Sequence, residues 1–279
     1  GWMSAEELVR EIGFAVVVRP GVAGDLSLPN ARSGWVPLEP DPASSRSVRS
    51  EIARGRLRRL PVPPAVMAQI VERGYYGCWT GPYGIWHDII SARAAALPAG
   101  LRTHVESVAR LAAEYACEFG LDARLGLLAG LAHDLFRGAG SSEIHAMVER
   151  AGIRLGTLEK KIPMLAHGAA AAAFLESLTP PPPPALCRAV RWHTFPRPAH
   201  APLTRALIMA DALDPSRGEL ERDRIRSSDL PIECRWKNVV ALKRVCADRA
   251  ERDRRDTEPG PAAVRTAGVF AAGSAWNPE

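Results

Sequence analysis

The sequence predicts a mostly α-helical protein, with a helical bundle over about residues 84–255 preceded by a small α/β segment. Two observations carry this prediction. From residue 85 onward, apolar residues recur with the helical period almost without interruption. Ala and Leu are abundant whereas only 6% of the residues are aromatic, a composition that favours helices over strands.

The helical region divides into segments at glycine, proline and polar residues. The proline run 180–184 must end one of these segments, because proline lacks an N–H and clashes with the preceding turn. We expect helices at 85–97, 102–119, 122–136, 141–152, 160–178, 183–193, 201–213 and 231–253.

Residues 1–80 follow a different pattern. The stretch FAVVVRPG, which begins at Phe14, has the composition of a short buried strand. A Gly/Pro/Ser-rich loop is expected from Gly21 to about Ser45, and two short helices separated by PVPP should follow it. Residues 77–84 mark the predicted domain boundary.

The two ends of the chain carry expectations of their own. Residues 256–279 are rich in Ala, Gly and Pro and predict a disordered tail. The first residue is Gly1 rather than Met, and the residues after it have the pattern of a domain interior. We therefore interpret the chain as a fragment of a longer protein.

Charge and cysteine content narrow the class of protein. The net charge is +5 and most basic residues are arginine, so the charge is weak evidence for nucleic acid and suits polyphosphate substrates equally well. The five cysteines are scattered without a CxxC pair, so neither disulfides nor a zinc knuckle is indicated, and a reducing, cytoplasmic setting is expected. No apolar run reaches the ~18 residues that a membrane span needs.

The densest group of chemically active residues is GLAHDLFRG, where His133 and Asp134 are adjacent at the end of an apolar helix. A buried carboxylate is costly without a partner, and a metal ion would hold it ionised. Taken alone, the pair is weak evidence, because a helix C-cap with a solvated Asp explains it equally well.

Four further residues, on other predicted helices, strengthen the metal interpretation. Each sits at an apolar helix segment or end, and each alone could be a surface, core or capping residue. Together they have the nitrogen and oxygen composition of a metal site in the core of a helical bundle. They are His104, His167, His193 and Asp211.

The order H…HD…H…H…D resembles the HD-domain superfamily of metal-dependent phosphohydrolases. The stretches RTHVESVARLAAEYA, LLAGLAHDLFRG, LAHGAAAAAFL, RAVRWHTFPRP and IMADALDPSR further resemble the YqeK family of symmetrical dinucleoside tetraphosphatases, over about residues 84–250. This resemblance implies an all-helical fold and a two-metal centre. It also implies hydrolysis of diadenosine tetraphosphate to two ADP, with His133 and Asp134 as catalytic residues.

The resemblance also implies how two ions would be held, with a hydroxide between them attacking phosphorus. The first ion would be bound by His104, His133, Asp134 and Asp211, and the second by His167 and His193, with Asp134 bridging. Iron is the metal that the resemblance implies, although the ligand types also suit manganese, cobalt or zinc.

Cationic side chains close to these motifs are candidates for binding the polyphosphate. They are Arg137, Arg197 and Arg217, joined by Thr194 of the His-Thr step. Arg137 stands where the family commonly has Lys, and Phe195-Pro196 replaces its usual Thr-Gly pair, a change that would narrow the pocket or shift Arg197. Among the other histidines, His145 and His200 are interpreted as surface residues.

The segment SSRSVRSEIARGRLRRLPVPPAVMAQIVERGYY resembles the C-terminal end of bacterial nicotinate-nucleotide adenylyltransferases. By this analogy Ser44, Ser45 and Arg49 would contact a nucleotide phosphate. No histidine precedes His87, so the HxGH motif of that family is missing, and residues 1–80 alone are not expected to adenylylate a substrate.

Several alternatives stay open. The chain could be another HD-type nucleotide phosphohydrolase, a silent HD binding domain, or part of a bifunctional adenylyltransferase and hydrolase in NAD synthesis, fused to an upstream domain. The expected partner is a small nucleotide substrate rather than a membrane or nucleic acid, and the sequence is compatible with a homodimer.

Overall fold

The computed structural model describes residues 13–16, 32–35, 44–196, 199–218 and 220–257. The chain forms two compact units, Gly1–Val48 and Arg49–Glu279. In the first unit, strands β1 (Gly13–Val16) and β2 (Arg32–Trp35) pair in parallel. Of the predicted disordered tail, residues 258–279 lie outside the described residues, as does Arg197, whereas residues 256 and 257 are helical.

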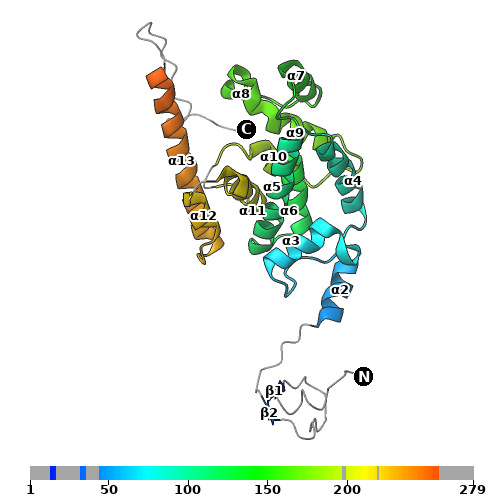
Figure 1. Ribbon diagram of the computed structural model, residues 1–279. Helices are drawn as coiled ribbons and strands as arrows, with labels where there is room; N and C mark the ends of the chain where they lie inside the picture. Colours follow the sequence, from blue (N-terminus) through cyan, green and yellow to red (C-terminus); the bar gives the residue numbers. More distant parts are fainter. Residues whose placement is uncertain (1–12, 17–31, 36–43, 197–198, 219, 258–279) are drawn as a thin grey trace. The chain divides into compact units, whose positions relative to one another are not determined.

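The second unit is helical (Figure 1). Helix α2 begins just before the boundary between the units, and the elements then follow one another along the chain. They are α2 (Ser45–Ala53), α3 (Pro64–Arg73), η1 (Tyr75–Gly77), α4 (Pro82–Ala95), α5 (Ala99–Glu118), α6 (Ala123–Ala132), α7 (Ser141–Arg150), α8 (Thr157–Lys161), η2 (Pro163–Ala166), α9 (His167–Glu176), α10 (Pro184–Trp192), α11 (Pro202–Ala212), η3 (Pro215–Arg217), α12 (Leu220–Arg226) and α13 (Ile232–Thr257).

Helices α5 and α6 form the centre of this unit and pack against each other at close range. Glycines permit this approach: a Cβ on Gly126 would lie 2.2 Å from the carbonyl oxygen of Ala112, and one on Gly130 would lie 2.3 Å from Cα of Ala109. The first residues of α5 therefore lie beside the last residues of α6, which places His104 near His133.

Helix α9 packs against α10 through small side chains. The alanines 169–173 are all buried, and a Cβ on Gly168 would lie only 3.0 Å from the carbonyl oxygen of Val190. Helix α11 lies against α5, α6 and α10, and its C-terminal part is buried around Asp211. Helices α12 and α13 follow, and α13 contacts both α11 and α12 (Figure 1).

The mostly helical prediction is confirmed, and the differences lie in details. The helix expected at 160–178 is divided into α8, η2 and α9, because Pro163 lacks the N–H that would continue the turn. Strand β2 lies inside the stretch expected to be a loop. Helix α12 has few apolar residues, so its sequence carried no helical signal.

The predicted domain boundary at residues 77–84 also differs from the structure. The compact helical unit begins at Arg49, because α3 packs against α5 and α6. The origin of residues 1–80 as an adenylyltransferase remnant stays a prediction. Within the described part of the chain, no helix is both long and apolar enough to cross a membrane.

Candidate metal centre

The six predicted ligands converge from five places in the fold. His104 lies in the second turn of α5, His133 and Asp134 directly follow α6, and His167 is the first residue of α9. His193 follows α10, and Asp211 is near the end of α11. Each of these five helices thus contributes one or two side chains, at or near one of its ends, to the same site.

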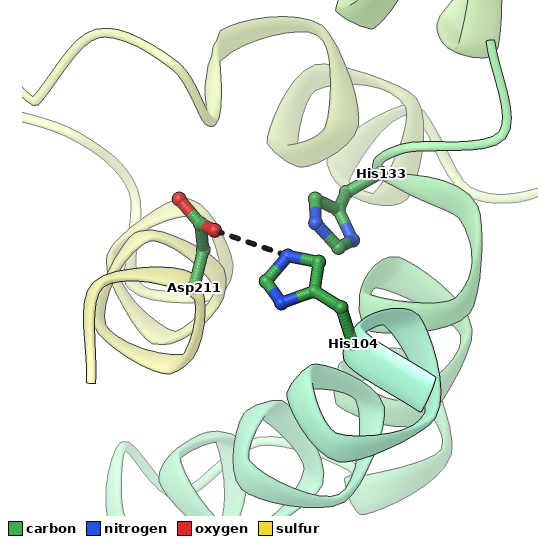
Figure 2. A group of neighbouring side chains, drawn as sticks. All are labelled: His104, His133 and Asp211. Atoms are coloured by element: carbon green, nitrogen blue, oxygen red, sulfur yellow. Dashed lines mark ion pairs between the residues drawn. The ribbon is translucent and has the colours of Figure 1, made fainter. Parts of the chain in front are cut away.

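One group of these side chains consists of His104, His133 and Asp211, which face one another in Figure 2. Nε2 of His104 lies 3.5 Å from an oxygen of Asp211 and 3.7 Å from Oδ2 of Asp134. Nε2 of His133 lies 3.4 Å from the same Oδ2. The described ligand atoms of the group all lie within 4.8 Å of one another, close enough to share one ion.

The second group forms on the other oxygen of Asp134. Nε2 of His167 lies 3.1 Å from Oδ1 of Asp134, and Nε2 of His193 lies 3.7 Å from it. The two Nε2 atoms are 3.1 Å apart. The two oxygens of Asp134, which is 1% exposed, therefore face different histidine groups.

All four imidazole rings hydrogen-bond through Nδ1 and direct Nε2 into the cluster. Nδ1 of His133, His167 and His193 lies 2.6, 2.5 and 2.7 Å from the backbone carbonyl oxygen three residues earlier in each case. A ring that donates Nδ1–H to a carbonyl has a lone pair on Nε2. Metal-binding histidines usually donate their other ring N–H to a carbonyl or carboxylate in this way.

His104 uses a carboxylate for the same purpose. Its Nδ1 lies 2.7 Å from Oδ2 of Asp214. The hydroxyl of Ser107 donates to Oδ1 of this carboxylate, and the hydroxyl of Ser216 donates to Oδ2. Asp214 is fully buried. The sequence reasoning missed this residue, although the Asp-Pro step after α11 is a recognisable cap: Asp214 accepts the backbone N–H of Ser216.

The arrangement of these side chains favours binding of a cation. Lone pairs of four Nε2 atoms and two carboxylates converge, and Nε2 of His104 and of His133 is buried without a hydrogen-bond partner among the described residues. Facing lone pairs at 3.1 Å repel each other unless a positive charge lies between them. Residues of these types hold iron, manganese, cobalt or zinc, so the residues present fit a metal ion.

The pKa shifts agree with this electrostatic environment. Burial and the neighbouring His167 and His133 lower the pKa of His193 to about 4, so this ring is neutral near pH 7 and ready to ligate. Burial would lower the pKa of His133 as well, but the carboxylates of Asp134 and Asp211 reverse the shift and raise it. Burial would raise the pKa of Asp134, but His133 and its neighbours hold it far below its ordinary range.

Cationic side chains surround the two carboxylates. Arg137 donates to Oδ2 of Asp134 at 2.7 Å, and Arg217 pairs with Oδ1 of Asp211. Lys243, which the sequence reasoning did not select, has its Nζ 3.4 Å from Oδ2 of Asp211. The hydroxyl of Thr194 lies 3.5 Å from Nε2 of His193. The structure thus places three of the four predicted substrate-binding residues at the cluster, and Arg197 is outside the described residues.

The residues predicted to contact a nucleotide phosphate near the N-terminus lie at the start of α2. Ser44 caps this helix by accepting the backbone N–H of Ser47 at 3.1 Å. Ser45 is the first residue of α2 and is exposed. Arg49 lies over the ring of Tyr76 at 6.0 Å. These contacts neither require nor exclude a phosphate.

The histidines outside the cluster have other surroundings. The ring of His87 stacks on Trp79 with a centroid distance of 4.2 Å. Nε2 of His200 lies 2.6 Å from the carbonyl oxygen of Phe195, so His200 is half-buried rather than a surface residue as the sequence suggested. His145 is exposed on α7, as expected.

Comparisons with known proteins agree with this geometry. A comparison with curated proteins found no match. Among solved structures, the chain resembles a crystal structure of a predicted HD superfamily hydrolase involved in NAD metabolism from Clostridium acetobutylicum, with 20% identity and a TM-score of 0.51. The similarity covers 61% of this chain and 87% of that chain, and it shows the fold.

The family comparison covers the region of the metal cluster. The model of the HD domain family matches residues 101–216, a range that holds all six clustered ligands as well as Asp214, and Arg217 directly follows it. Lys243 lies beyond it. With the helical fold and the convergence of histidines and carboxylates, this match identifies residues 101–216 as an HD domain.

Proposed function

We propose that this chain is a metal-dependent phosphohydrolase that cleaves diadenosine tetraphosphate symmetrically into two ADP. The observation that carries the proposal is the placement of Asp134, whose two oxygens each face a separate histidine group. Two groups of ligands that share one buried carboxylate are what a pair of neighbouring ions requires.

Charge balance supports a substrate rich in phosphate. The carboxylates of Asp134 and Asp211 are already paired with three cations, those of Arg137, Arg217 and Lys243. Two divalent ions would therefore add about four positive charges to a buried, low-dielectric site. An anion with several negative charges restores neutrality, and a tetraphosphate chain carries about that many.

Residues around the cluster would bind and orient the phosphate groups of the substrate. Bound ions would supply Lewis acidity and a nucleophile from water at neutral pH. Arg137 and Arg217 are 46% and 34% exposed, so their guanidinium groups can turn to phosphate oxygens, which they bind in bidentate fashion. Thr194, whose hydroxyl lies at the edge of the cluster, can donate a hydrogen bond to a bridging or terminal phosphate oxygen.

The choice of a symmetrical dinucleoside tetraphosphate rests on the sequence resemblance over residues 84–250. The ligand order and the local stretches around each ligand support it, and Arg137 keeps the positive charge of the Lys that it replaces. Phe195 and Pro196 replace the family's usual Thr-Gly pair directly after Thr194, and we expect them to influence which nucleotide fits beside the cluster. Iron is the metal that we propose, by the same resemblance.

The test joins metal content with product analysis. Protein purified without chelator is analysed for metals and then incubated with diadenosine tetraphosphate under anaerobic conditions, with added iron or manganese. We expect about two ions per chain and ADP as the sole product. ATP plus AMP would retain the hydrolase and reject symmetrical cleavage, and no turnover after loading with either metal would reject the enzyme.

Matched variants connect the activity with the cluster. His133→Ala and Asp134→Ala should each lower the metal content and reduce turnover by at least ~100-fold, because even outer-shell partners of a metal commonly matter by 10–100-fold. His145→Ala, at an exposed position of α7, is the control and should change neither quantity. Circular dichroism establishes that the variants keep their helices.

A role in NAD metabolism is the second candidate. The structural neighbour from Clostridium acetobutylicum is described as involved in NAD metabolism, and residues 44–76 resemble the end of an adenylyltransferase. Under this proposal the hydrolase would be one half of a bifunctional protein with an upstream nucleotidyltransferase domain. Turnover of nicotinate mononucleotide or its adenylylated product by the HD domain, in preference to diadenosine tetraphosphate, would favour it.

A further inference from the structure

Lys243 lies on α13, outside the matched HD domain, yet its ammonium group reaches the metal cluster. Its Nζ is 3.4 Å from Oδ2 of Asp211. We propose that Lys243 is a substrate-binding residue that holds a phosphate group on the Asp211 side of the site. This inference rests on the proposed function, because it assigns a binding role within the same site.

The contacts of Asp211 show why Lys243 is more than a partner for this carboxylate. Oδ1 of Asp211 already pairs with Arg217 and lies 3.5 Å from Nε2 of His104. Arg217 alone balances the single negative charge of Asp211. Lys243 on Oδ2 is therefore a second cation on one carboxylate, a surplus that a bound anion would match.

Metal binding strengthens this argument. An ion held by Asp211 and His104 would draw on the same carboxylate oxygens that Lys243 and Arg217 contact. Two cationic side chains would then lie beside a metal ion, and like charges repel strongly in a partly buried site. A phosphate oxygen bound between the metal ion and the two cationic side chains would attract all three, and lysine is a common phosphate-binding residue.

The position of Lys243 on its helix explains how it reaches the site. Val239 and Val240 are buried on α13, and Lys243 is four and three residues further along, on the same helix face. The valines anchor this face of the helix and α13 contacts α11, which carries Asp211 (Figure 1). The side chain of Lys243 is 21% exposed, so a ligand from solvent can contact it.

The decisive measurement is the affinity of ADP, the proposed product, for the full chain loaded with manganese. Lys243→Met keeps the aliphatic stem and removes the charge. We expect it to weaken ADP binding at least ~10-fold in calorimetry, with unchanged manganese content. Lys243→Arg keeps the charge and should stay within about threefold of the wild type. Lys237→Met, at an exposed position of α13, is the matched control and should bind ADP as the wild type does.

Two results would overturn the proposal. Unchanged ADP affinity in Lys243→Met would show that the charge does not contact the ligand. A loss of manganese from this variant, with normal ADP binding once manganese is restored, would make Lys243 a partner of Asp211 only. If Lys243→Met does not fold, Lys243→Gln, which also lacks the charge, replaces it.

The measurements distinguish a missing hydrolase activity from a missing phosphate-binding role of Lys243. If the wild type binds ADP through Lys243 but does not cleave diadenosine tetraphosphate, the hydrolase proposal fails and the phosphate-binding role stands. If the wild type cleaves the substrate and Lys243→Met has an unchanged KM, the role of Lys243 fails alone. Absence of ADP binding by the metal-loaded wild type would overturn the inference.

Discussion

Asp214 shows how a residue that holds no metal in the proposed scheme can still determine the metal site. It accepts a hydrogen bond from Nδ1 of His104, and the hydroxyls of Ser107 and Ser216 hold the carboxylate in place. Burial would raise the pKa of Asp214, but these hydrogen bonds lower it, so the carboxylate is ionised near neutral pH. His104 is consequently held with Nε2 directed at Asp211 and Asp134.

We predict that Asp214→Asn weakens metal binding and turnover by about 10- to 100-fold, because this is the usual effect of removing an outer-shell carboxylate. An amide can present its NH₂ group to the histidine and thereby disfavour the required tautomer. Metal titration of the chelator-treated protein measures the affinity. Asp88→Asn, at an exposed position of α4, is the control, and equal affinities in both variants would contradict the role of Asp214.

Tyr115 illustrates a different consequence of burial. Its hydroxyl has no hydrogen-bond partner among the described residues, and burial raises its pKa to about 12 from an ordinary value of 10. The folded state therefore keeps the proton that the unfolded chain releases above pH 10. The stability contributed by this difference is complete below pH 10 and is lost as the pH rises towards 12.

We predict that the free energy of unfolding falls by about 1 kcal/mol between pH 9 and 10.5 on account of Tyr115 alone. Tyr115→Phe should be at least as stable as the wild type at pH 8, since it removes a buried hydroxyl without a partner. It should also lose less stability at alkaline pH. Urea unfolding at both pH values measures this, and an equal or steeper loss in the variant would contradict the prediction.

At the scale of the helices, the close contact between α5 and α6 brings the first histidine to the His-Asp pair. Gly126 and Gly130 leave no room for a side chain, so the two backbones touch along the contact. The sequence motif GLLAGLAHD already contains these glycines, but the helical period alone treats them as weak helix formers. Their packing role becomes visible only when the partner helix is known.

We predict that Gly130→Ala destabilises the protein by about 1–3 kcal/mol, the usual cost of overpacking a core. The new Cβ would lie 2.3 Å from Cα of Ala109, so the two helices must move apart and His104 must leave His133. Metal affinity should fall together with stability. Gly138→Ala is the control, because its Cβ would meet nothing within 4 Å. If both variants unfold at the same urea concentration, the close contact at Gly130 does not contribute to stability as we predict.

At the scale of the whole chain, the predicted features are those that a local pattern carries. Histidine and aspartate at apolar helix ends are recognisable in the sequence, and the structure brings His104, His167 and Asp211 to the His-Asp pair. Lys243 could not be found in this way, because a lysine on a polar helix is common and only the packing of α13 on α11 gives it a role. Strand β2 was missed because its pairing with β1 is a non-local interaction.

Metal binding should couple the five ligand-bearing segments into one stability unit, since residues from α5, α6, α9, α10 and α11 meet at the cluster. We predict that EDTA lowers the Tm of the metal-loaded protein by about 5–10 °C. An ion present at about 100 times its Kd adds roughly 2.7 kcal/mol, and each kcal/mol moves the Tm of a domain of this size by about 2–4 °C. Differential scanning calorimetry with and without EDTA measures the shift. Asp134→Ala should respond little to EDTA, because the shared carboxylate is gone. An identical Tm for the loaded and chelated wild type would mean that the cluster holds no ion tightly, and the two-metal proposal would lose its basis.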